Sequence, residues 1–182
     1  MSKVFVGGSR RIIRLHPEVA LRLDQILASK ASILVGDANG ADKSVQHFLK
    51  TKEYHEVEVF CSGDQCRNNV GNWPLRRVAV DSRKRDFDFY AAKDQLMSRE
   101  ADLGLMIWDG KSAGTLMNAF RLVRQGKRVS IFESQHNRFQ ELYNESQWKD
   151  FFSTCSDELK LRIEKLSASD PEIARPVQAS LL

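Results

Sequence analysis

The sequence has few of the residues that define several common classes of protein. It holds three cysteines and four scattered histidines in 182 residues, so the ligand clusters of a structural zinc site are missing and we predict no metal. No apolar run approaches the ~20 residues of a membrane helix, and no signal peptide is visible. We therefore expect a cytoplasmic protein without a membrane partner, with Cys61 and Cys66 as reduced thiols.

Two familiar phosphate-binding motifs are also missing. The stretch KVFVGGSRRI at residues 3–12 is a short apolar strand that enters Gly7 and Gly8 directly. It is not GxGxxG, and no lysine follows in the Walker pattern. Glycine nevertheless lets backbone N–H groups approach a ligand closely, and Ser9 and Arg10 add a hydroxyl and a guanidinium suited to an anion.

Basic residues exceed acidic residues by four, which favours anionic partners without choosing among them. One basic cluster, Arg10, Arg11 and Arg14, lies on the first glycine loop. We interpret a second cluster as a solvent-exposed face; it comprises Arg76, Arg77, Arg83, Lys84 and Arg85.

Short apolar segments alternate with amphipathic ones along most of the chain. We expect strands at 4–6, 33–35, 57–60, 78–80, 103–108 and 128–132, and helices at 17–28, around 45–49, at 87–101 and up to 123 or 124. This order predicts an α/β, Rossmann-like fold with a mostly parallel sheet flanked by helices. Loops at residues 7–11, 36–43 and 109–115 should then converge at the carboxyl edge of the sheet, where ligands bind.

The chain changes character after residue 133. We assign residues 1–133 to the nucleotide-binding part and residues 134–182 to a C-terminal helical extension of the same domain. Helices are expected at 138–152 and 156–166, and a loosely ordered tail at 167–182. The extension shows no catalytic signature.

Three motifs, in their order along the chain, resemble the SLOG superfamily. They are VFVGGSRR, ILVGDANGADKSV and AAKDQLMSREADLGLMIWDGKSAGT, and the resemblance covers roughly residues 3–132. GDANGAD is similar to the YspA-like branch; Lonely-Guy-type nucleotide phosphoribohydrolases and DNA-processing protein A are other members. The resemblance implies a nucleotide or nucleotide-derived ligand at the sheet edge, no cofactor, and a homo-oligomer, with a dimer as the simplest form.

The loops and the resemblance together predict the ligand contacts. The predicted binding residues are Gly7, Gly8, Ser9, Arg10, Gly36, Asp37, Asn39, Gly40, Asp42, Lys43, Lys93, Asp109, Lys111, Ser112, Gly114, Thr115 and Asn118.

Two departures from the hydrolase relatives bear on catalysis. Asn118 stands where those relatives keep a glutamate, and Lys93 stands where they keep an arginine. Asparagine cannot ionise, so it cannot support cleavage of an N-glycosidic bond as a carboxylate does. Asp37 and Asp42 are candidates for a relocated carboxylate, or else a turn residue and a residue of a first helical turn.

Three functions therefore stay open. The first is a module that senses or carries a nucleotide-like ligand, and the second is a nucleotide-processing N-glycosidase. The third, nucleic-acid binding, is not favoured because no helix-turn-helix or aromatic-basic platform is visible.

The polar loop after residue 60 allows two interpretations. Arg67, Asn68, Asn69 and Trp73 form either a lid over the ligand or an ordinary surface excursion with a partly buried tryptophan. Trp108, at the end of an apolar strand, is expected in the core.

Overall fold

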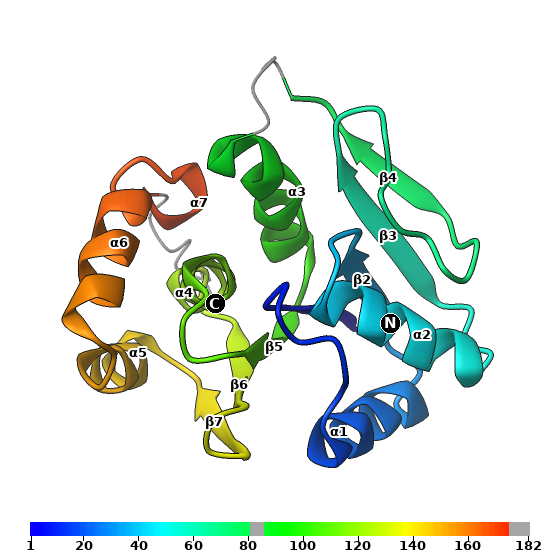
Figure 1. Cartoon of the computed structure of the whole chain (residues 1–182), viewed down its shortest axis with the longest axis horizontal. Coiled ribbons are helices and arrows are strands. Elements are labelled where there is room, and N and C mark those ends of the chain that lie inside the picture. Colours follow the sequence, from blue (N-terminus) through cyan, green and yellow to red (C-terminus); the bar gives the residue numbers. More distant parts are fainter. Residues whose placement is uncertain (81–85, 175–182) are drawn as a thin grey trace, which may run out of the picture.

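The computed structural model describes residues 1–80 and 86–174, and their strands form one seven-stranded sheet (Figure 1). The sheet order is β4-β3-β2-β1-β5-β6-β7, and every neighbouring pair is parallel except β6 and β7. The strands are β1 (Lys3–Gly8), β2 (Ser32–Gly36), β3 (Val57–Ser62), β4 (Leu75–Val78), β5 (Leu103–Trp108), β6 (Arg128–Glu133) and β7 (Arg138–Leu142). This architecture confirms the predicted α/β, Rossmann-like fold.

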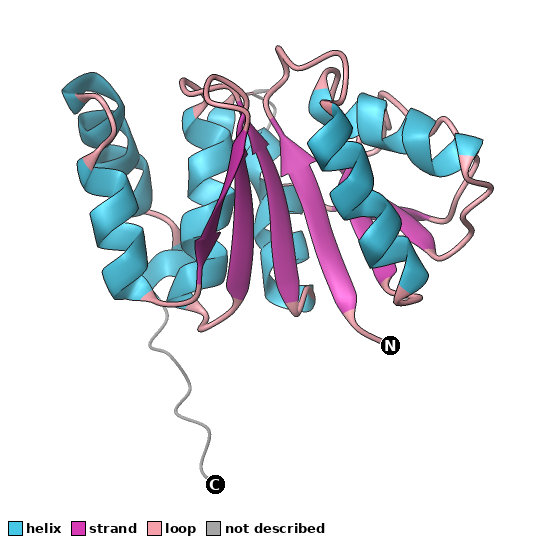
Figure 2. Cartoon of the chain, turned by 90° about the horizontal axis from the view of Figure 1, so that it is seen from below, coloured by secondary structure: helices cyan, strands magenta, loops and turns pink. Residues whose placement is uncertain are grey.

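Helices cover both faces of the sheet (Figure 2). The first face packs against α1 (Pro17–Ala28) and α2 (Ala41–Thr51). The second packs against α3 (Phe87–Glu100) and α4 (Ala113–Arg124), and α5 (Glu145–Ser153), α6 (Asp157–Ser167) and α7 (Pro171–Ala174) lie around α4. Because the inner strands are buried on both sides, they are continuous apolar runs rather than alternating ones.

The strand order positions the site. The chain runs outward from β1 to β2 and β3 on one side, and from β5 to β6 on the other. β1 and β5 are therefore adjacent in the sheet but connect to helices on opposite faces. In open α/β sheets, a crevice opens at such a point beyond the carboxyl ends of the strands.

The expected helix at 138–152 is wrong in its first part. Residues 138–142 form β7, which pairs antiparallel with β6, and α5 begins only at Glu145. Phe139 and Leu142 are spaced for a helix, but in the strand they face opposite sides of the sheet. Asn144 then caps α5, its side chain accepting a hydrogen bond from the N–H of Gln147.

The first part of the tail is also ordered, contrary to expectation. Residues 171–174 form α7, and Asp170 and Glu172 are buried. The remainder of the predicted tail, residues 175–182, lies outside the described residues, as do Arg83, Lys84 and Arg85 of the second basic cluster. Within the described ranges, no helix is long and apolar enough to span a membrane.

Candidate functional site

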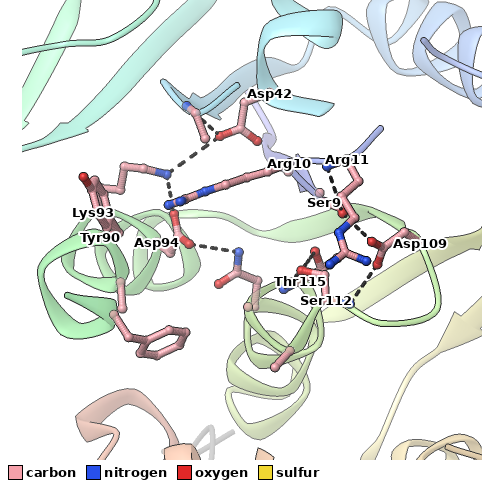
Figure 3. A pocket seen from close by; sticks show the side chains of 18 of the residues that line it. Ser9, Arg10, Arg11, Asp42, Tyr90, Lys93, Asp94, Asp109, Ser112 and Thr115 are labelled. Carbon is pink, nitrogen blue, oxygen red and sulfur yellow. Dashed lines mark hydrogen bonds and ion pairs between the residues drawn. The ribbon is translucent and has the colours of Figure 1, made fainter. Parts of the chain in front are cut away.

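A cleft of about 490 Å³ opens at the carboxyl ends of β1 and β5 (Figure 3). Its size falls within the range of small-molecule and nucleotide sites. The β1–α1 loop, the start of α3 and the β5–α4 loop with the start of α4 form its walls, and a residue of α6 reaches it. Of the predicted residues, it is lined by Gly7, Gly8, Ser9, Arg10, Asp42, Lys93, Asp109, Lys111, Ser112, Gly114, Thr115 and Asn118.

The β1–α1 loop is tied to the end of β5. The N–H of Ser9 donates to the carbonyl of Ile107 at 2.9 Å, and its hydroxyl donates to Asp109 at 2.8 Å. Burial would raise the pKa of Asp109, but hydrogen bonds from Ser9 and from the backbone of Lys111 and Ser112 hold it below its usual value. Asp109 is thus an ionised residue that fixes two loops against each other.

The start of α4 presents backbone donors to the cleft. Ser112 is the N-cap, and its hydroxyl accepts hydrogen bonds from the N–H and the hydroxyl of Thr115. The N–H groups of Ala113 and Gly114 donate no hydrogen bond to any of the described residues. These groups and the positive end of the helix dipole suit an anion.

The second glycine loop supports the first loop more than it lines the cleft. Gly40 has a φ of +82°, and a Cβ there would overlap the backbone of Arg10. The N–H of Ala41 also donates to the carbonyl of Ser9 at 3.0 Å. Asn39 and Lys43 are exposed and do not line the cleft, so their predicted contact with ligand remains a prediction.

Asp37 is held by the loop that follows β3. Arg67 binds its two carboxylate oxygens at 2.6 and 3.1 Å and adds a backbone N–H at 3.0 Å. Burial alone would raise the pKa of Asp37, but these bonds lower it. Asp37 therefore anchors this loop and does not line the cleft, which leaves it poorly placed for catalysis.

The loop after β3 packs down on the protein. Asn68 donates to the Asp37 carbonyl, and Trp73 is buried with its indole N–H donating to the carbonyl of Tyr54. Trp73 therefore does not offer a stacking face to the cleft. Trp108 lies in the core, as predicted.

Cys61 and Cys66 form a disulfide, so the expectation of reduced thiols is wrong for this pair. The turn at Gly63, with a φ of +73°, brings the two residues together. Their sulfurs and a carboxylate oxygen of Asp37 lie within 4.8 Å of one another. The sulfurs are bonded to each other and the carboxylate is paired with Arg67, so this group has no free set of metal ligands.

A chain of interacting polar side chains crosses the bottom of the cleft, and we call it the floor network. Lys93 contacts Asp94 at 2.6 Å and Asp42 at 3.8 Å, and Asn118 donates to Asp94 at 3.3 Å. Arg121 donates to Asn118 and forms a buried ion pair with Asp170 at 2.7 Å. The network comprises Asp42, Lys93, Asp94, Asn118, Arg121 and Asp170.

Burial and neighbouring charges shift the pKa values of Asp42 and Lys93. Burial raises the pKa of Asp42 to about 6, against the opposing charge of Lys93. Burial would lower the pKa of Lys93, but Asp94, Asp42 and Asp37 together raise it, so the ammonium keeps its proton. Lys93 lies closer to Asp94 than to Asp42. Its charge therefore lowers the pKa of Asp42 by less than burial raises it.

The upper walls of the cleft carry basic side chains of another kind, which we call the rim cations: Arg10, Arg11, Lys111 and Arg162. None of the four forms an ion pair with a described acidic residue. Arg10 lies over the ring of Tyr90, with 4.9 Å between its guanidinium carbon and the ring centroid. All four are exposed.

Several cleft residues were not predicted from the sequence as ligand contacts. Tyr90 and Asp94 lie on α3, and a carboxylate at helical spacing from the apolar Ala91 and Met97 is a signal that could have found Asp94. Arg121 and Arg162 gave no local signal, because each reaches the cleft only through the packing of α4 and α6.

Comparison with known proteins finds similarity to solved structures only at the level of the fold. No family model and no curated protein matches the chain. A solved structure of DNA processing protein A from Helicobacter pylori, described for its single-stranded DNA binding mode, is similar with a TM-score of 0.54 and 14% identity. The match covers 91% of this chain and 80% of that one. At this identity the likeness shows the fold alone.

Proposed function

We propose that the cleft binds a nucleotide or nucleotide-derived ligand, as a sensor or carrier module of the YspA-like kind. The observation that carries the proposal is that the unpaired rim cations and the free N–H groups of Ala113 and Gly114 line the same cleft. Unpaired guanidinium and ammonium groups beside a helix start form strong hydrogen bonds to phosphate oxygens. Lower in the cleft, Asp94 and Asn118 offer oxygen and amide groups suited to the hydroxyls of a ribose.

Titration calorimetry with nucleoside monophosphates and the matching bare nucleosides tests this proposal. Arg10→Ala should weaken binding of the monophosphate about tenfold or more, because a charge-assisted hydrogen bond contributes roughly 1.5–3 kcal/mol. Binding of the bare nucleoside should change little. Thr115→Val should act in the same direction, since it also disturbs the cap at Ser112.

Lys50→Ala is the matched control, because Lys50 is exposed on α2 and does not line the cleft. It should leave both affinities unchanged. Equal weakening of nucleoside and monophosphate by Arg10→Ala would place the phosphate elsewhere. No binding of any monophosphate to the unmodified protein would contradict the proposal itself.

A second candidate function is that of an N-glycosidase with a relocated carboxylate. Two carboxylates, Asp42 and Asp94, lie in the cleft on either side of Lys93 (Figure 3). With its pKa near 6, Asp42 can donate a proton near neutral pH, and Asp94 can stabilise positive charge on a ribose. Asp37, the other candidate from the sequence, lies outside the cleft.

Chromatography of monophosphate reactions separates the two candidates. The binding module predicts no release of free base, whereas the enzyme predicts release that falls about 10²-fold or more in Asp94→Asn. Asp37→Asn serves as a comparison, because its effect on turnover should be smaller if Asp94 carries the chemistry. Release that survives in Asp94→Asn and disappears in Asp37→Asn would exclude this assignment.

Nucleic-acid binding is the third candidate, and the similarity to a protein described as binding single-stranded DNA favours it. The rim cations could contact successive phosphates of a strand. Fluorescence anisotropy with a ten-nucleotide oligothymidine tests nucleic-acid binding. The affinity should depend steeply on salt and should weaken in Arg11→Gln. A homo-oligomeric assembly and a cytoplasmic location also remain proposals.

A further inference from the structure

The C-terminal extension contributes one basic side chain to the cleft. Arg162 lies on α6 and lines the cleft together with loops more than 40 residues away in sequence. Among the described residues it has neither an ion pair nor a hydrogen bond. By contrast, Lys160 on the same helix pairs with Asp157 at 3.3 Å.

Acidic side chains of the cleft form no ion pair with Arg162 among the described residues, and each makes other contacts. Asp86 caps α3 by accepting the N–H of Phe89 at 3.1 Å, and Asp109 accepts the hydroxyl of Ser9. Asp94 is bound by Lys93 and Asn118, and Asp42 lies buried below. An exposed guanidinium without an acidic partner among the described residues keeps its five donors for a ligand.

Arg162 lies apart from the other rim cations. Arg10 and Arg11 follow β1, and Lys111 precedes α4, so these three come from the two loops beside the helix start, whereas Arg162 comes from α6. Figure 1 shows α4 between the end of β1 and α6, and α4 packs against both. The helix that carries Arg162 therefore lies on the side of α4 away from β1, and Arg162 lines the cleft from there.

We propose that Arg162 binds a second anionic group, so that the cleft takes nucleoside diphosphates in preference to monophosphates. One phosphate lies at the start of α4 near Arg10, Arg11 and Lys111, and the next lies toward α6. This inference rests on the proposed nucleotide site and names its ligand class. It also gives the C-terminal extension a role in recognition.

Calorimetry with AMP, ADP, GMP and GDP tests the inference on the full chain. The diphosphates should bind the unmodified protein about tenfold or more tightly than the monophosphates, the loss expected for one charge-assisted contact. Arg162→Gln should remove most of this preference and change the monophosphate affinities less than twofold. Arg162→Lys should retain part of it, because lysine keeps the charge but not the planar fork.

Lys165→Gln is the matched control, since Lys165 is an exposed basic residue on the same helix that does not line the cleft. It should leave the diphosphate preference intact. Monophosphate and diphosphate binding with equal affinity, unaffected by Arg162→Gln, would overturn the inference while the nucleotide site stands. Equal weakening of both classes by Arg162→Gln would also overturn it, by placing Arg162 at a shared group. If none of the four nucleotides bound, both this inference and the proposed function would be wrong.

Discussion

Charges on the floor of the cleft are paired, whereas those on its rim are not. Lys93 and Arg121 are almost fully buried and each contacts carboxylates, with side-chain exposures of 5% and 1%. Arg10 and Arg162 are exposed and have no acidic partner among the described residues. A buried charge must be compensated within the protein, whereas an exposed one is solvated and stays free for a ligand. The floor network therefore stabilises the site, and the rim cations stay available to bind an anionic ligand.

The largest expected effect comes from breaking the buried pair of the floor network. Asp170→Ala leaves the Arg121 guanidinium buried without its partner, which should lower the free energy of unfolding by about 3–5 kcal/mol. Denaturant unfolding measures it. Asp157→Ala, which breaks the exposed pair with Lys160, is the control and should cost less than about 1 kcal/mol. Equal losses in the two variants would mean that the floor pair is no different from a surface pair.

Asp42 should make stability depend on pH. Its pKa is about 6 in the folded protein and 3.8 in the unfolded chain, so the folded state holds the proton more tightly. The stabilisation is fully present below about pH 4 and is lost as the pH rises through about 6. Comparing unmodified protein with Asp42→Asn at pH 4 and pH 8, the difference in unfolding free energy should change by about 3 kcal/mol. Parallel pH curves for the two proteins would contradict the raised pKa.

Gly36 tests how closely the backbone approaches the floor. A Cβ at Gly36 would overlap the carboxylate of Asp42 and crowd Lys93. Gly36→Ala should therefore destabilise the protein by about 1–3 kcal/mol, the usual cost of forcing packed groups apart. Gly114→Ala is a suitable control because its Cβ would meet only Phe87 at 4.0 Å, and thermal unfolding should show no loss. A similar loss at both glycines would rule out crowding of the floor as the cause.

The smallest expected effect on stability belongs to the rim. Arg11→Gln should change the unfolding free energy by no more than about 0.5 kcal/mol, because its side chain pairs with no described residue. The same variant should weaken binding of a nucleoside phosphate about tenfold. A large loss of stability with unchanged binding would reverse the roles given to rim and floor.

The sequence predicted the parts of this molecule that depend on local pattern. Short apolar runs followed by glycine-containing loops located β1, β2 and β5, and their parallel order placed the first and third loops at one edge. Gly8, Arg10 and Thr115 accordingly meet in the cleft. The second loop was found as well, but whether Asp37 lines the cleft or anchors a loop depends on Arg67, which lies 30 residues further along the chain.

What sequence reasoning missed depends on tertiary packing. The spacing of Phe139 and Leu142 fits a helix as well as a strand. Residues 138–142 form β7 because they pair with the edge of β6. Residue Asp170, taken for part of a loose tail, is fixed by Arg121. Arg162 reaches the cleft only because α6 packs against α4.

We expect the start of α4 and the β1–α1 loop to bind a phosphate group. Titration of ¹⁵N-labelled protein with ADP, followed by amide chemical shifts, tests it most directly. We expect the largest shift changes at the amides of Gly8, Ala113 and Gly114, with little change at the exposed Lys50 outside the cleft. If the amide chemical shifts of the cleft stay unchanged at millimolar ADP, or if only residues outside the cleft shift, then no phosphate binds at this position.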